Sequence, residues 1–79
     1  MDIQAKVFDI VAEVLRIRRE KITFSSKFKE DLGADSLDLI ELEIAIENEF
    51  DIKIPDEDAE LMLLIGDVVQ YIKSKKGVK

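Results

Sequence analysis

Apolar residues recur at helical spacing in two stretches of this 79-residue chain, which favours a helical fold. Near its start, apolar side chains recur three and four positions apart, which is the spacing of one face of an α-helix. The same spacing returns after Ser36. We therefore predict a first helix over roughly residues 3–16 and a second from about Ser36 to Asp51. The core-facing stripes of these two helices are Ile3, Val7, Ile10 and Val14, joined by Val11 and Leu15, and then Leu39, Leu42, Ile46 and Phe50.

The rest of the chain adds two shorter helices and no convincing strand. Ile52-Lys53-Ile54-Pro55 is expected to be extended, because the residue before a proline disfavours helical backbone. Residues 56–62 are predicted to form a short third helix with acidic residues in its first turn. Residues 65–75 are predicted to form a fourth helix that ends in basic residues and Gly77. The sequence thus predicts an all-α fold, a small four-helix bundle, in a single domain over residues 1–79.

A long connection, residues 17–35, separates the first two helices. A structureless loop of that length is unusual in a compact domain. Its spaced apolar residues predict that it packs over the core and contains a short helical turn. Ile22-Thr23-Phe24 also fits a brief strand, although the sequence offers no convincing partner strand.

Composition excludes several classes of protein. The chain has no cysteine and no histidine. Disulfide frameworks and thiolate zinc sites are therefore excluded, and the commonest general base is absent. No apolar run approaches the roughly 20 residues that a membrane-spanning helix needs. We expect a soluble, cytoplasmic, monomeric protein without a metal site.

Negative charge is concentrated in the middle of the chain. The formal net charge is −6. Between Glu30 and Glu60 there are thirteen Asp or Glu residues and a single lysine, Lys53. Such a block disfavours nucleic acid as a partner and favours proteins with basic surfaces. The alternative is a solvated face that only keeps the protein soluble.

The second predicted helix carries a further apolar stripe, formed by Leu37, Ile40 and Ile44, nearly opposite its core face. A small bundle buries two faces of one helix with difficulty. We interpret this stripe as a docking surface with an apolar centre and an acidic rim. Packing of the stripe under the 17–35 connection is the alternative that the pattern leaves open. Glu41 and Glu47 flank the stripe, and Asp38 lies nearby.

Ser36 is the candidate functional residue. It lies at the start of the second predicted helix, where Asp35 fits the N-cap position and Asp38 a capping-box arrangement. A serine nucleophile needs a neighbouring base. The chain has no histidine, and Lys27 and Lys29 belong to no motif that connects them to Ser36. Neither a P-loop nor an EF-hand pattern is present. The hydroxyl is therefore better placed to be modified by another enzyme than to catalyse.

An ordered set of motifs around Ser36 resembles the acyl carrier protein family, in register over nearly the whole chain. A bare Asp-Ser-Leu would be a weak signal, whereas the complete set is specific. The motifs are Asp31-Leu32-Gly33-Ala34-Asp35-Ser36-Leu37-Asp38, then Glu41, Leu42, Glu47, Phe50 and Asp51, then Ile54-Pro55-Asp56, and later Gly66-Asp67-Val68.

The resemblance implies that Ser36 receives 4′-phosphopantetheine from coenzyme A through a separate phosphopantetheinyl transferase. A helix start suits the phosphate, because its N–H groups favour anions. It further implies a non-catalytic carrier of acyl thioesters in bacterial-type fatty acid biosynthesis, with the acyl chain sheltered between helices. The residues to which the resemblance assigns contacts with the transferase and the fatty acid enzymes are Asp35, Leu37, Asp38, Ile40, Glu41, Ile44, Glu47 and Asp56.

Two other functions fit the same residues. One is a specialised carrier for a polyketide, peptide or lipid-modifying pathway. The other is an unmodified helical adaptor that has kept only the docking surface.

Several positions depart from the family pattern. Arg16 stands where a helix-ending glycine is common, and Leu64 where a Ser or Thr cap often precedes the fourth helix. Glu43 occupies an often apolar position and either shifts the second helix or alters the acyl pocket. The apolar run from Leu61 to Ile65 has three possible roles: it lines an enlarged acyl cavity, forms a patch for a partner, or adds to the core. We favour the role in the core.

Overall fold

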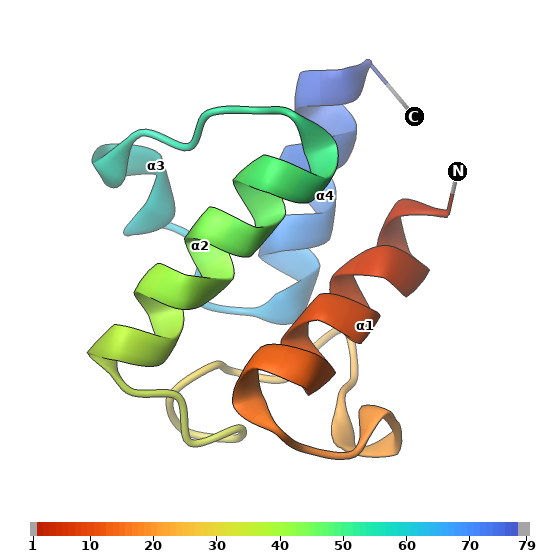
Figure 1. The fold of residues 1–79 in the computed structure, drawn as a ribbon, viewed down its shortest axis with the longest axis vertical. Coiled ribbons are helices and arrows are strands. Elements are labelled where there is room, and N and C mark those ends of the chain that lie inside the picture. Colours follow the sequence, from red (N-terminus) through yellow and green to blue (C-terminus); the bar gives the residue numbers. More distant parts are fainter. Residues whose placement is uncertain (1, 78–79) are drawn as a thin grey trace.

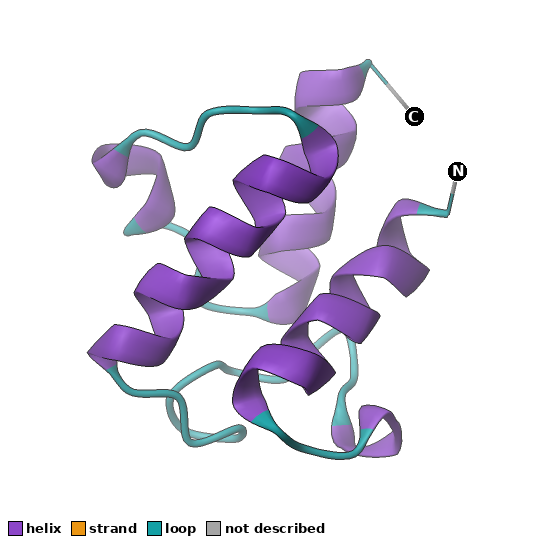
Figure 2. Cartoon of the chain, viewed as in Figure 1, coloured by secondary structure: helices purple, strands orange, loops and turns teal. Residues whose placement is uncertain are grey.

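The computed structural model describes residues 2–77 and confirms the all-α fold. Within these residues the chain forms four α-helices, one 3₁₀-helix and no β-strand (Figure 2). The helices in chain order are α1 (Ile3–Leu15), the 3₁₀-helix η1 (Arg19–Lys21), α2 (Ser36–Phe50), α3 (Asp56–Ala59) and α4 (Ile65–Lys76).

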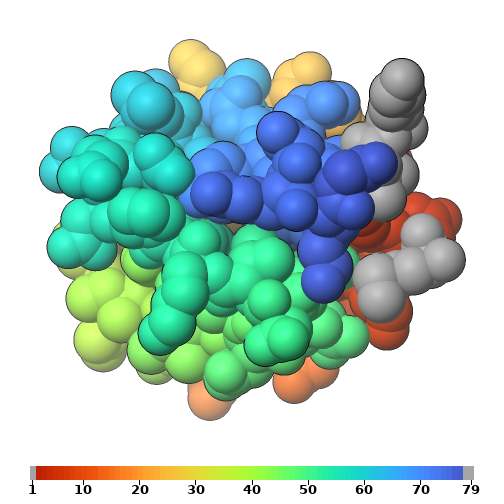
Figure 3. Space-filling view, turned by 90° about the horizontal axis from the view of Figure 1, so that it is seen from above, coloured from red at the N-terminus to blue at the C-terminus, as the bar shows by residue number. Residues whose placement is uncertain are grey.

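The three long helices form the body of the molecule (Figure 1). Helices α2 and α4 run in the same direction, and α1 runs against both. Seen from above, the C-terminal ends of α2 and α4 lie side by side (Figure 3). The core between the helices is formed by Val7 and Val11 of α1, Ile46 and Phe50 of α2, and Ile65, Val69 and Ile72 of α4.

Helix α1 ends without glycine. Its start is capped by Asp2, whose Oδ1 accepts a hydrogen bond from the Ala5 amide at 3.1 Å. At the other end, Arg16 takes a left-handed backbone with φ of 57°, and the Arg16 and Ile17 amides both donate to the Ala12 carbonyl. Arginine therefore occupies the position that glycine favours, at a conformational cost.

The 17–35 connection contains the predicted helical turn, η1, and packs over the core through the buried side chains of Ile22 and Phe28. The alternative that residues 22–24 form a strand is wrong. Residues 24–28 instead pair with the end of the α3–α4 connection and with the first turn of α4. The Phe24 carbonyl accepts from the Gly66 amide at 2.8 Å, and the Phe28 amide donates to the Leu63 carbonyl at 3.2 Å.

Gly66 permits this pairing because it has no side chain. A Cβ atom at Gly66 would lie 2.5 Å from Cδ2 of the Phe24 ring and 2.9 Å from the Phe24 carbonyl oxygen. Both distances are shorter than real Cβ contacts. Glycine is required here for close approach of two backbone segments and not for a turn.

The predicted third helix is too long. It was expected to reach about residue 62, and α3 ends at Ala59. Beyond that point the amides of Leu61 and Met62 donate to carbonyls three residues earlier, at Asp58 and Ala59, so the backbone tightens into turns. The exposed Leu61 side chain provides no buried face that would extend the helix.

Helix α4 starts without a Ser or Thr cap. Asp67, in its first turn, compensates, because its Oδ2 accepts hydrogen bonds from the Leu63 and Leu64 amides, each at 3.0 Å. The helix ends at Lys76 and is capped by Gly77, which has a φ of 72° and donates its amide to the Lys73 and Ser74 carbonyls. Sequence prediction placed both ends of α4 to within one residue.

Candidate functional site

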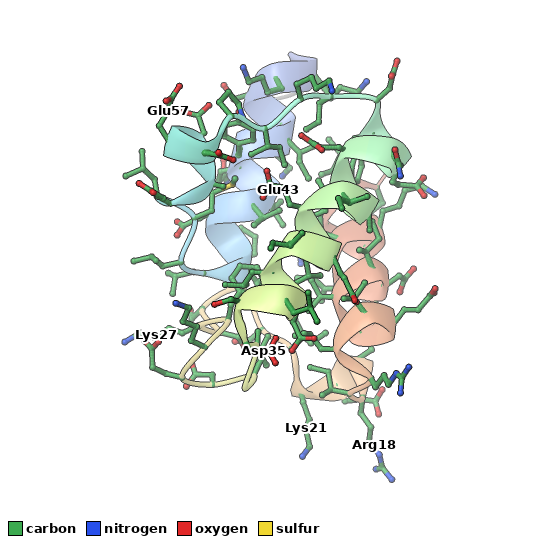
Figure 4. All side chains as sticks on the ribbon, turned by 60° about the vertical axis from the view of Figure 1, so that its left-hand side comes forward. Arg18, Lys21, Lys27, Asp35, Glu43 and Glu57 are labelled. Carbon is green, nitrogen blue, oxygen red and sulfur yellow. The ribbon has the colours of Figure 1, made fainter. Side chains whose placement is uncertain are left out.

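Ser36 is the first residue of α2 and is exposed to solvent. The predicted capping box is present. Asp35 Oδ1 accepts from the Asp38 amide at 2.8 Å, and Asp38 Oδ2 accepts from the Asp35 amide at 3.2 Å. Figure 4 shows Asp35 at the end of α2 that meets the long connection. The reciprocal bonds fix the backbone on both sides of Ser36.

The segment before Ser36 is anchored to the connection. The Ala34 amide donates to the Phe28 carbonyl at 2.9 Å, and the Gly33 amide donates to the Lys29 carbonyl at 3.2 Å. Gly33 has a left-handed φ of 69°, which glycine adopts without strain. Ala34 is buried against the core. The start of α2 is thus held in place although Ser36 itself faces solvent.

The geometry at Ser36 suits an attached phosphate group. Within residues 2–77 the Ser36 hydroxyl makes no hydrogen bond to another group, so it is free to react. The amides of Ser36 and Leu37 belong to the first turn of α2 and have no intrahelical acceptor. Such amides, with the positive end of the helix dipole, stabilise an anion. Ser36 therefore fits the phosphodiester of a 4′-phosphopantetheine group.

The second apolar stripe of α2 lies on the surface. The exposed fractions are 65% for Leu37, 53% for Ile40 and 52% for Ile44. The alternative that the 17–35 connection covers this stripe is therefore wrong. Three large aliphatic side chains in solvent on one helix face form an apolar patch, which we call the α2 outer stripe.

The predicted acidic partner residues differ in their environments. Asp35, Glu41 and Asp56 are exposed, and Asp38 and Glu47 are half-buried. Asp56 begins α3 and lies outside α2. The structure therefore places seven of the eight predicted partner residues at or on α2 and one beside it.

Glu47 has a structural contact that the sequence did not indicate. Its Oε2 accepts a hydrogen bond from the Ile54 amide at 2.7 Å, which ties the α2–α3 connection to α2. Ile54 is itself buried in the core. One carboxylate oxygen of Glu47 is thus already used inside the molecule.

A cavity of about 350 Å³ opens between α2, α3, α4 and the long connection. Its inner wall is apolar and largely buried, and charged residues stand among its lining. The lining residues are Phe28, Lys29, Leu39, Leu42, Glu43, Ile46, Ile54, Ala59, Glu60, Met62, Leu63 and Val68.

The apolar run after α3 extends the core only in part, through Ile65 and through Met62, which packs against the core. Leu61 is 75% exposed and Leu63 66% exposed, and only Ile65 is fully buried. Met62 and Leu63 line the cavity. The alternative role of this run, lining a cavity, therefore applies to Met62 and Leu63.

Helix α3 is attached to α4 by one polar contact. The Tyr71 hydroxyl donates to Asp58 Oδ2 at 2.7 Å. Burial, together with this hydrogen bond, raises the pKa of Tyr71 to about 12. The phenol therefore stays protonated and holds the contact throughout the physiological range. Sequence reasoning missed the pair, since thirteen positions separate the two residues.

Glu43 lines the cavity from the middle of α2. Burial raises the pKa of its carboxyl group above the usual value, and the charges of Glu47 and Asp56 raise it further. Figure 4 shows Glu43 on the side of α2 that faces α3 and α4. The sequence left two interpretations of Glu43, a shift of the second helix or an altered acyl pocket. The position of Glu43 in the cavity lining matches the altered pocket, and α2 continues past Glu43 as an unbroken helix.

The described residues contain neither a membrane-spanning helix nor a cluster of metal ligands. No helix in residues 2–77 combines the length and apolar character needed to cross a bilayer. In the same residues, no three or more His, Cys, Asp or Glu side chains are grouped so that they could hold a metal ion.

Comparison with known proteins gives matches over most of the chain. The family model described as "Phosphopantetheine attachment site" matches residues 5–72. The acyl carrier protein of Wolinella succinogenes is 52% identical over 68 residues, which cover 86% of this chain and 90% of that protein. The acyl carrier protein of Clostridium acetobutylicum is 55% identical over 69 residues, which cover 87% of this chain and 90% of that protein.

Proposed function

The chain belongs to the acyl carrier protein family, and we propose that it carries the acyl intermediates of fatty acid biosynthesis on a 4′-phosphopantetheine arm attached to Ser36. Membership in this family implies a covalent 4′-phosphopantetheine group. The observation that supports Ser36 as its attachment point is the exposed hydroxyl at the first position of α2, within the matched region.

Ser36 acts in this proposal as an acceptor. Its Oγ forms a bond to the phosphorus of coenzyme A that bears the pantetheine, while the diphosphate bond on the other side of that phosphorus breaks. The adenosine bisphosphate leaves with the bond's electron pair, and the serine proton passes to a base of the transferase. The described chain holds only the reacting oxygen and the amides that favour the new phosphodiester.

When attached, the arm supplies the thiol that holds the acyl group as a thioester. The protein contributes shelter for the acyl chain in the cavity between α2, α3, α4 and the long connection. Each methylene that leaves water for this wall contributes about 0.8 kcal/mol. Such gains are small enough for a partner enzyme to reverse, so the same cavity can bind and release its cargo.

The α2 outer stripe, Leu37, Ile40 and Ile44, is the proposed docking surface. It lies next to Ser36 on the same helix, and its side chains are already in solvent. An apolar centre provides binding energy, and a carboxylate rim orients partners with basic surfaces. The proposed rim is Asp35, Asp38, Glu41, Glu47 and Asp56.

The proposed partners are the phosphopantetheinyl transferase and the enzymes of fatty acid synthesis, which perform the catalytic steps. The chain is proposed to act as a cytoplasmic monomer and as a single carrier domain over residues 1–79. Residues 1, 78 and 79 of that range lie outside the described part.

The test is enzymatic loading followed by intact-mass measurement. The apo protein is incubated with coenzyme A and a transferase of broad specificity. We expect the mass to rise by one phosphopantetheinyl group in the unmodified sequence and in Ser74→Ala, which alters an exposed serine on α4. We expect no rise in Ser36→Ala. An unchanged mass in the unmodified sequence would contradict the carrier function and favour an unmodified adaptor. Loading of Ser36→Ala would show that another residue is the attachment site.

The pathway needs a second measurement. Mass spectrometry of the acyl group on protein purified from its natural host distinguishes the possible cargoes. Straight-chain fatty acyl groups and their intermediates support fatty acid biosynthesis. A polyketide, an aminoacyl group or a single dedicated lipid would instead assign the chain to a specialised pathway.

A further inference from the structure

The lining of the cavity is not uniformly apolar. Phe28, Leu42 and Ile46 are buried and form part of its inner wall. Two of its charged residues, Lys29 and Glu60, are exposed and stand at the opening. Glu43 is different, because it is half-buried and places an ionisable carboxyl group among the apolar lining residues.

The Glu43 carboxyl group has no partner within residues 2–77. No hydrogen bond or ion pair joins it to another described group, whereas the neighbouring Glu47 accepts from the Ile54 amide. Burial and the negative charges of Glu47 and Asp56 raise the pKa of Glu43. A half-buried carboxyl group in this environment is stabilised by any hydrogen-bond donor that comes to it.

The position of Glu43 along α2 relates it to the attachment point. Ser36, Leu39 and Glu43 are spaced by three and then four residues, which places them on one face of the helix. Leu39 and Glu43 both line the cavity. Glu43 therefore lies on the Ser36 face of α2, about 10 Å along the helix axis from the attachment point, where an arm attached to Ser36 can bring the thioester and the first carbons of its acyl chain.

We propose that Glu43 makes this cavity selective for acyl chains that carry a hydroxyl group near the thioester, such as 3-hydroxyacyl chains, over saturated chains of equal length. A saturated chain displaces water from Glu43 and offers no hydrogen bond in return. A hydroxyl group donates to the carboxylate while the remaining methylenes pack on the inner wall. This inference rests on the proposed function, since the chain must first receive its arm at Ser36.

The experiment compares two cargoes on one protein. The apo protein is loaded by the transferase from octanoyl-coenzyme A or from 3-hydroxyoctanoyl-coenzyme A, and loading is verified by intact mass. The rate at which hydroxylamine cleaves each thioester then reports how well the chain is sheltered. Thioesters of the same two acids on free pantetheine provide the intrinsic rates. Dividing by these rates gives a protection factor for each cargo.

We expect the protection factor of the hydroxylated chain to exceed that of the saturated chain by about tenfold, a discrimination typical of a hydrogen bond to a charged group. Glu43→Leu, which extends the apolar wall, is expected to reverse the preference. Glu43→Gln keeps a hydrogen-bonding amide and is expected to retain a smaller preference of the same sign.

The control variant is Glu49→Leu, which removes a carboxylate from an exposed position of the same helix, where Glu49 pairs with Lys6 at 3.4 Å. It is expected to keep the preference of the unmodified sequence. Equal protection of both cargoes in the unmodified sequence, or an unchanged preference in Glu43→Leu, would overturn the inference while leaving the carrier function intact. Failure of loading at the mass measurement would overturn both.

Discussion

Helix α2 presents the same kind of residue to two opposite environments. Its inner stripe, Leu42, Ile46 and Phe50, is at most 3% exposed, whereas the outer stripe of Leu37, Ile40 and Ile44 is at least half exposed. Both stripes consist of large apolar side chains at helical spacing. The difference lies in what faces them, since the inner stripe packs against the buried residues of α1 and α4.

The comparison separates stability from recognition within one helix. Side chains of the inner stripe gain their free energy when the chain folds, because folding removes them from water. Side chains of the outer stripe remain in water and gain theirs only when a partner covers them. Substitutions in the two stripes should therefore change different measurements.

The largest expected effect is on folding. Phe50→Ala removes a side chain that is 2% exposed and should lower the free energy of unfolding by about 3–5 kcal/mol. Ile46→Val, a milder change, should cost about 0.5–1.5 kcal/mol. Ile44→Ala, in the outer stripe, should change it by less than about 0.5 kcal/mol. Urea denaturation followed by circular dichroism measures all three, and equal losses from both stripes would contradict the comparison.

The converse effect is on modification by the transferase. Ile44→Ala should lower kcat/KM for transfer to Ser36 by about tenfold, the effect of removing a side chain central to an interface. Ile46→Val should leave kcat/KM unchanged per folded molecule although it weakens the fold. If Ile46→Val slowed transfer as much as Ile44→Ala, the outer stripe would have no special part in docking.

A smaller effect is expected where the two functions meet, at the start of α2. Asp35→Ala removes the acceptor for the Asp38 amide and should destabilise the protein by about 1 kcal/mol. Asp35→Asn keeps an acceptor at the cap and removes the charge. It should therefore preserve most of the stability while still slowing a transferase that recognises the carboxylate. Thermal denaturation and initial rates, measured on both variants, separate capping from recognition.

The smallest expected effect is a pH dependence from Glu43, at the edge of the inner stripe. Its pKa is raised in the folded state, so folding favours the protonated carboxyl group and stability falls as pH rises through the folded-state pKa. The groups that surround it are Glu47, Asp56 and the charged lining residues Lys29 and Glu60.

Glu43→Gln should therefore melt at a higher temperature than the unmodified sequence near pH 7. The difference should vanish below the ordinary Glu value of 4.5, where both side chains are neutral. Melting temperatures measured from pH 4 to 7 test this, with Glu49→Gln as the control for loss of one carboxylate. A difference that grew towards low pH would reverse the sign that we assign.

Local signals in the sequence predicted much of the fold and of the site. Helix boundaries at Ser36 and Ile65 follow from apolar spacing, and the Asp35–Asp38 capping box follows from residues three apart. Motif order identified Ser36 as the candidate modification site. These features depend on neighbours in the chain, which a sequence displays directly.

Features that depend on residues far apart in the chain were either not predicted from the sequence or predicted incorrectly. The end of α3 and the exposure of Leu61 and Leu63 depend on how the chain returns towards the long connection. The cavity is lined by residues spread between Phe28 and Val68, and no local sequence pattern predicts a space between them. The Tyr71–Asp58 contact likewise joins residues that only the tertiary fold brings together.

The backbone pairing between Phe24 and Gly66 has a consequence for folding kinetics. It joins positions 42 residues apart, whereas each long helix is stabilised first by bonds four residues apart. Closing so large a loop lowers the entropy of the chain before the contacts that compensate for this loss have formed. Helices α1 and α2 can therefore form early, and we expect the 24–28 segment to settle only after α4 has docked. The part of the long connection that anchors the residues before Ser36 would then be among the last parts of the molecule to become rigid.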